Sequence, residues 1–135
     1  VEPGVAALAA AHHLPELLDR MQDAVDELRE GAEGGGQAQT VAADAEFHRL
    51  IGYSIDNPAI TKLTDQMFAE GGAERRLSLS VPGQAARAAE DHQRILDAIR
   101  AGDEAGARDA MLNHLVAAVE WITDYSHHPT NQEEP

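Results

Sequence analysis

The chain has 135 residues with 24 acidic and 10 basic side chains, so its formal net charge is −14 at pH 7. Binding to nucleic acid requires a basic face that displaces counterions from phosphates, which argues against that role for this chain alone. The same charge argues against a polybasic membrane-surface module. The chain has no cysteine, which excludes disulfides, thiolate metal sites and cysteine nucleophiles.

Length and hydropathy favour one domain away from membranes. A chain of this size buries roughly two-thirds of its unfolded surface, enough for a real core. Because aromatic residues make up only 4%, that core must consist mainly of Ala, Leu, Ile and Val. The longest apolar run, residues 5–11, is far shorter than the roughly 20 residues of a spanning helix, and no secretory signal is visible. We expect a cytoplasmic protein with no membrane partner.

Helical signals dominate the chain, and we find no convincing strand. Pro15 opens the second helix, Thr40 caps the third, Asn57 precedes a first-turn proline in the fourth, and Asp103 caps the last. The run Gly34-Gly35-Gly36 predicts a flexible loop. The expected helices cover residues 3–12, 15–31, 41–55, 58–70, 84–101 and 104–125, with a further turn or two at 73–80. The predicted fold is all-α, an antiparallel bundle of six or seven helices over residues 1–125, followed by a disordered tail at 126–135.

Histidines occupy otherwise apolar faces of three of these helices. In the third helix, one face carries Val41, Asp44, His48, Ile51 and Ile55, separated by three, four, three and four residues. The helix over 84–101 places His92 on the same face as Ala89 and Leu96. The last helix places His114 between Met111 and Ala118. Four polar side chains on three helices are therefore predicted to point inward.

A divalent cation is the partner that satisfies this set best. A buried aspartate without a partner costs several kcal/mol or stays protonated. Three imidazoles and one carboxylate, from Asp44, His48, His92 and His114, form a ligand set that Zn²⁺, Ni²⁺ or Mn²⁺ accepts. We expect Zn²⁺, with Ni²⁺ and Mn²⁺ as alternatives; the nitrogen-rich set excludes a Ca²⁺ or Mg²⁺ specialist.

Each residue also has a simpler interpretation. A single inward histidine is more often a hydrogen-bonded core residue than a ligand. Asp44 could be a first-turn aspartate whose negative charge interacts favourably with the helix dipole. The pairs His12-His13 and His127-His128 fall at helix ends, where solvated surface is the expected role. The combination of all four inward groups, with the Asp44/His48 pair on one face, favours the metal.

The same residues carry a family likeness. The stretch from Asp44 through His48 to Ile51, the dipeptide Asn57-Pro58, the segment 90–103 with His92, and the segment 111–115 with His114 resemble the FCD domain. That domain is the C-terminal effector-binding domain of FadR-type GntR transcription regulators. The likeness extends over residues 2–122.

The resemblance implies a metal held by Asp44, His48, His92 and His114, and a small carboxylate metabolite bound beside it. It also implies a homodimer and a cytoplasmic transcription regulator rather than an enzyme. Four side chains are candidates for effector binding: Arg75, Arg76, Arg49 and Asn113. A regulator of this type contacts DNA through an N-terminal winged helix-turn-helix domain, which is absent from this chain, so we expect the chain to be a fragment.

Two other functions remain open at the level of sequence. A small metalloenzyme could use the metal to activate water, with Glu46 or Glu90 as the base. Four protein ligands leave less room for that water than the three of most catalytic zinc sites. A helical interaction module could instead pack its inward histidines without metal. The sequence names neither the effector nor the target operator, and it does not separate repressor from activator.

Overall fold

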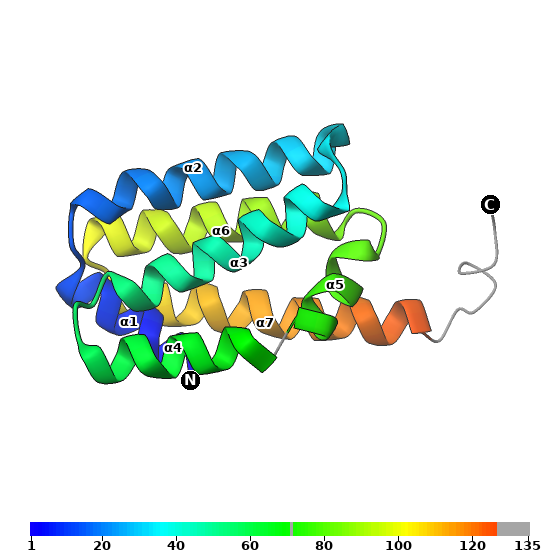
Figure 1. Ribbon diagram of the computed structural model, residues 1–135. Coiled ribbons are helices and arrows are strands. Elements are labelled where there is room, and N and C mark those ends of the chain that lie inside the picture. The colour runs from blue at the N-terminus through cyan, green and yellow to red at the C-terminus, as the bar shows by residue number, and fades with distance from the viewer. Residues whose placement is uncertain (71, 127–135) are drawn as a thin grey trace.

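The computed structural model describes residues 1–70 and 72–126, and its regular elements there are helices (Figure 1). The α-helices are α1 (Glu2–His12), α2 (Glu16–Glu30), α3 (Gln37–Tyr53), α4 (Pro58–Glu70), α5 (Gly72–Ser80), α6 (Gln84–Ala101) and α7 (Glu104–Ser126). The predicted all-α bundle is confirmed, with seven α-helices in the described ranges. The expected tail beyond residue 126 lies outside the described residues.

The long helices α2, α3, α6 and α7 form the body of the bundle (Figure 1). The closest packed pairs are α1 with α7, α2 with α3, and α6 with α7. The short α5 lies across one end of the bundle, where it contacts α3, α6 and α7. None of the helices in the described ranges is long and apolar enough to cross a membrane.

Several predicted helix boundaries are confirmed by hydrogen bonds. The Asn57 carboxamide oxygen accepts from the backbone N–H of Ala59 at 2.9 Å, and α4 begins at Pro58. Asp103 Oδ1 accepts from the N–H of Gly106 at 2.9 Å and caps α7. Gly102 ends α6 in the left-handed conformation, with φ 72°, which glycine adopts at little cost.

The start of α3 differs from the prediction. Thr40 was expected to cap this helix, but α3 begins three residues earlier, at Gln37, and the Thr40 hydroxyl donates to the Gln37 carbonyl oxygen at 2.8 Å. The physical reason is the glycine run. Gly34 and Gly36 have φ of 143° and 100°, so the chain reverses there after a wide turn at Gly31–Gly35 and the helix starts immediately.

The core is built mainly from small and aliphatic side chains, as the composition predicted. Phe47 is fully buried in it and lies on the face of α3 that meets α6. Ile55, predicted as the last residue of the α3 stripe, lies beyond the helix end at Tyr53 but still packs against the core. The largest buried side chains of the main cluster are Met21, Val25, Phe47, Leu50, Ile51, Ile95, Leu96, Ile99 and Met111.

Candidate metal centre

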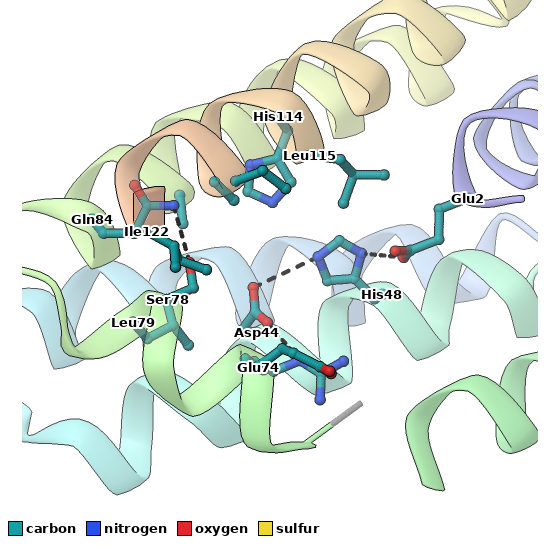
Figure 2. A pocket seen from close by; sticks show the side chains of 14 residues that line it. Glu2, Asp44, His48, Glu74, Ser78, Leu79, Gln84, His114, Leu115 and Ile122 are labelled. Carbon is teal, nitrogen blue, oxygen red and sulfur yellow. Dashed lines mark hydrogen bonds and ion pairs between the residues drawn. The ribbon is translucent and has the colours of Figure 1, made fainter. Parts of the chain in front are cut away.

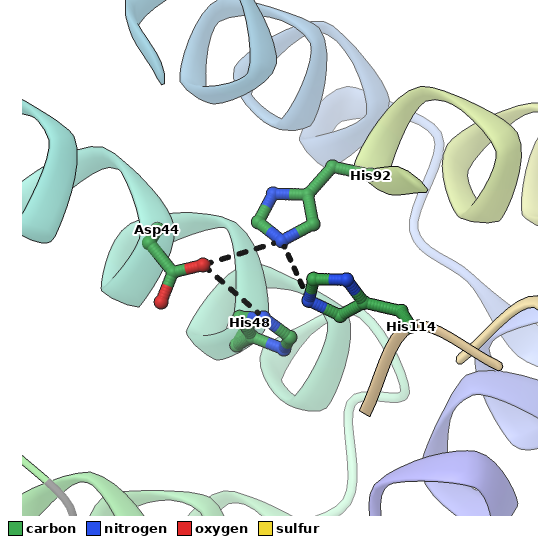
Figure 3. Close-up of side chains that lie close together, drawn as sticks. All are labelled: Asp44, His48, His92 and His114. Atoms are coloured by element: carbon green, nitrogen blue, oxygen red, sulfur yellow. Dashed lines mark hydrogen bonds and ion pairs between the residues drawn. The ribbon is translucent and has the colours of Figure 1, made fainter. Parts of the chain in front are cut away.

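The four predicted ligands converge inside the bundle (Figure 3). Asp44 and His48 lie one turn apart on α3, His92 comes from α6 and His114 from α7. All four are buried, with exposed fractions of 6%, 7%, 0% and 5%. No two of their four donor atoms are more than 4.8 Å apart. The structure therefore brings the four side chains together as the helical spacing predicted, and their role as metal ligands stays a prediction.

Three of the six donor separations match those around a metal, and all six are at most 4.8 Å. Asp44 Oδ1 lies 3.2 Å from His92 Nε2 and 3.6 Å from His48 Nε2, and the Nε2 atoms of His92 and His114 are 3.3 Å apart. Ligand bonds of 2.0–2.2 Å in tetrahedral geometry place neighbouring donors about 3.3–3.6 Å apart. Two imidazole nitrogens facing each other can share only one proton, whereas a cation satisfies both. The residues present therefore fit a divalent transition metal.

Further charged groups surround the cluster. Glu2 Oε1, at the start of α1, lies 2.7 Å from His48 Nδ1. Asp91 Oδ2, on α6, lies 3.0 Å from His114 Nδ1. Arg75 Nε, on α5, lies 2.9 Å from Asp44 Oδ2, and its guanidinium stacks over the Phe68 ring at 4.5 Å. Five helices thus contribute to the centre.

These contacts set the protonation of the metal-free cluster. Burial alone would lower the pKa of His48, but the carboxylates of Glu2 and Asp44 outweigh burial and raise that pKa to about 10. Burial lowers the pKa of His92 to about 4. Burial would raise the pKa of Asp44, yet His48 and His92 hold it well below its usual range. Without a metal, a protonated His48 and the guanidinium of Arg75 are therefore the cationic partners of Asp44.

A cavity of about 250 Å³ opens beside the cluster (Figure 2). Asp44, His48 and His114 line it, so a metal held by the cluster would border this space. Arg75 also lines it. The remaining lining residues are Glu2, Glu74, Ser78, Leu79, Gln84, Ala88, Leu115, Ala118, Val119 and Ile122. The cavity therefore combines a polar side, at the cluster, with an apolar wall from α7.

Comparison with known proteins assigns the family. The FCD domain model matches residues 1–117. The chain belongs to the FCD domain family. This FCD domain is 31% identical over 130 residues to the HTH-type transcriptional regulator LutR of Bacillus subtilis (strain 168), covering 93% of the chain and 58% of LutR. It is 28% identical over 115 residues to a probable D-xylose utilization operon transcriptional repressor of Paenarthrobacter nicotinovorans, covering 84% of the chain and 50% of that repressor.

Solved structures share the fold of this FCD domain. E. coli McbR/YncC matches with a TM-score of 0.78 at 19% identity, covering 93% of the chain and 60% of that protein. Streptococcus agalactiae GntR matches with a TM-score of 0.68 at 24% identity, covering 88% of the chain and 52% of that protein. The domain thus spans only about half to three-fifths of each of these relatives.

The four effector candidates occupy different places in this FCD domain. Arg75 lines the cavity and reaches the cluster. Arg76 is exposed, and its backbone carbonyl oxygen accepts from the Gln37 side chain at 3.1 Å. Arg49 is half-buried beside Phe68, and Asn113 is exposed. None of Arg49, Arg76 and Asn113 is among the described residues that line the cavity, so the structure brings only Arg75 to it.

Sequence reasoning missed three residues of the centre. Glu2 reaches His48 only because α1 packs back across α7, which no local pattern reveals. Asp91 directly precedes His92, and this neighbouring pair was the available signal. Gln84, at the start of α6, is 1% exposed and lines the cavity. Its Nε2 is 3.5 Å from the Ser78 hydroxyl, while its buried Oε1 has no hydrogen-bond partner in the described part of the chain.

Proposed function

We propose that this FCD domain is the ligand-sensing part of a transcription regulator. It binds one divalent transition metal, Zn²⁺ in preference to Ni²⁺ or Mn²⁺, through Asp44, His48, His92 and His114. A small carboxylate metabolite then binds at the metal from the cavity and controls DNA binding by a separate N-terminal domain. The observation that carries the proposal is the convergence of four buried donors at the edge of a cavity.

The charges around the cavity support a metal-dependent anion site. The lining residues include the carboxylates of Glu2, Asp44 and Glu74 and the guanidinium of Arg75. Arg75 is already paired with Asp44 at 2.9 Å, so it offers an incoming anion little uncompensated charge. A bound divalent cation would supply the positive centre that a carboxylate oxygen can ligate. A carboxylate should therefore bind the metal-loaded domain and not the metal-free one.

The test is calorimetric titration of acetate, malonate, succinate and citrate into metal-loaded and metal-free protein. We expect at least one of them to bind only when the metal is present. Once a bound metal compensates the Asp44 carboxylate, the Arg75 guanidinium is left to attract the incoming anion, so Arg75→Met should weaken that binding. Arg76→Met, one position along α5, should leave it unchanged. Equal binding with and without metal, or no binding of any probe, would contradict the proposed site.

The regulatory part of the proposal depends on the relatives. LutR and the Paenarthrobacter repressor are transcription regulators, and the chain covers 58% and 50% of them. An effector that acts on a DNA-binding domain must favour one arrangement of that domain by a coupling free energy, typically about 1–3 kcal/mol. The homodimer and the cytoplasmic location stay predictions of the same kind. Sedimentation of the metal-loaded domain tests the dimer.

A further inference from the structure

We propose that Glu2 and Asp91 are positioning residues of the metal centre. Each holds the Nδ1 atom of one ligand imidazole, which leaves the Nε2 atom of that ring to face the metal. This inference rests on the metal-binding function proposed above and assigns a role to two carboxylates outside the ligand set. Both act through a histidine and neither is a ligand.

Glu2 controls the orientation of His48. Its Oε1 lies 2.7 Å from Nδ1 of His48, a close ion-pair contact rather than an aligned hydrogen bond, while Nε2 on the opposite side of the ring lies 3.6 Å from the carboxylate of Asp44. Figure 2 shows the ring between the two acidic side chains. A neutral imidazole carries one proton, and a carboxylate at Nδ1 keeps that proton there. The lone pair of His48 is then on Nε2, where a metal would be bound.

Asp91 plays the same part for His114. Its Oδ2 lies 3.0 Å from Nδ1 of His114, and Nε2 of that ring points at Nε2 of His92, 3.3 Å away. The other Asp91 oxygen accepts a hydrogen bond from Arg94, so the carboxylate is itself held in place. Asp91 is only 7% exposed. As the neighbour of His92 on α6, it fixes the α7 ligand from the helix that supplies another ligand.

The third imidazole is held differently. Nδ1 of His92 is buried and has neither a hydrogen bond nor an ion pair among the described residues, whereas Nδ1 of His48 has the ion pair with Glu2. Its ring instead stacks on Phe47, with the ring centres 4.2 Å apart and the planes within 9°. Packing orients this ligand, whereas a carboxylate orients each of the other two. Metal affinity should therefore depend on Glu2 and Asp91 in a way that general packing does not explain.

The experiment measures Zn²⁺ affinity by chelator competition and the visible absorption of the Co²⁺-loaded protein. The variants are Glu2→Leu, Glu2→Gln, Asp91→Leu and Asp91→Asn. Glu90→Gln and Glu90→Leu are the matched controls, since Glu90 is exposed and directly precedes Asp91 on α6. Far-UV circular dichroism and thermal melting of each metal-free variant show whether it folds. The Gln and Asn variants keep an acceptor oxygen and nearly the same volume, so they test the idea even where a Leu variant does not fold.

Loss of an outer partner of a metal-bound histidine typically lowers metal affinity 10–100-fold. We expect that loss for Glu2→Leu and Asp91→Leu, with a changed Co²⁺ spectrum, and a smaller loss for Glu2→Gln and Asp91→Asn. The Glu90 variants should match the unmodified protein. If the Zn²⁺ affinities of the Glu2 and Asp91 variants stay within about threefold of those of the Glu90 controls, the positioning role is overturned while the metal site stays intact. If the unmodified protein binds neither ion, the proposed function fails and this inference fails with it.

Discussion

Acid should destabilise the metal-free protein through His92. In the folded chain, burial lowers the pKa of this imidazole to about 4, against about 6.5 for an unfolded histidine. Below pH 6.5 the unfolded chain therefore binds a proton at His92, whereas in the folded chain the imidazole stays neutral until the pH approaches 4. The contribution of neutral His92 is fully present above pH 6.5 and is lost as the pH falls toward 4.

The size of the loss follows from the shift. A difference of 2.5 pKa units corresponds to at most about 3 kcal/mol of unfolding free energy, and about 2 kcal/mol of it is lost between pH 7.0 and 4.5. The raised pKa of His48 acts in another window. Its stabilisation is complete below pH 6.5 and is lost as the pH rises toward 10, so it is constant between pH 4.5 and 6.5.

The assay is urea unfolding in the presence of chelator at pH 7.0, 6.0, 5.0 and 4.5, for the unmodified protein and for His92→Gln. Glutamine removes the titration and keeps a polar side chain. Contributions from Glu2 and Asp91, whose pKa values are lowered by groups other than His92, are common to both proteins and cancel in the difference. His92 helps to lower the pKa of Asp44, but this carboxyl adds little above pH 4.5, because its pKa is about 3.9 in the unfolded chain and lower still in the folded one. Between pH 7.0 and 4.5, the free energy of unfolding of the unmodified protein should fall by about 2 kcal/mol more than that of the variant. A difference that does not change with pH would refute the burial argument.

Further substitutions test packing, capping and the cavity wall. Phe47→Ala removes a fully buried ring stacked on His92, so unfolding free energy should fall by about 3–5 kcal/mol and metal affinity should fall with it. Asn57→Ala removes the cap of α4 and should cost about 1 kcal/mol in urea unfolding, with metal affinity unchanged. Gln84→Met keeps the volume of a buried side chain whose Oε1 has no hydrogen-bond partner within residues 1–70 and 72–126, so the melting temperature of the variant should stay the same or rise.

The convergence of the four buried side chains could be predicted from sequence because it depends on local periodicity. Asp44 and His48 are four residues apart on one helix, and each remaining histidine interrupts an apolar stripe on its own helix. A stripe that faces the core must bring its polar members to the core as well. Applying this rule requires only the positions of the helices, and the caps at Asn57 and Asp103 mark where two of them begin.

The parts that could not be predicted depend on how the helices pack. Glu2 meets His48 through the packing of α1 against α7, and Arg75 meets Asp44 because α5 lies across the end of the bundle. Neither contact can be predicted from a local sequence pattern. The misassigned Thr40 cap has a local cause. The positive φ angles of Gly34 and Gly36 reverse the chain early, which a capping rule based on threonine does not consider.

The most direct test of the account is the metal content of the domain itself. Protein purified without a nickel column, dialysed against Zn²⁺ and then freed of excess ion should contain about one equivalent by elemental analysis. His92→Ala should contain much less, because the site needs its neutral imidazoles as ligands. Fewer than about 0.2 equivalents in the unmodified protein, or equal content in the variant, would contradict a metal held by Asp44, His48, His92 and His114.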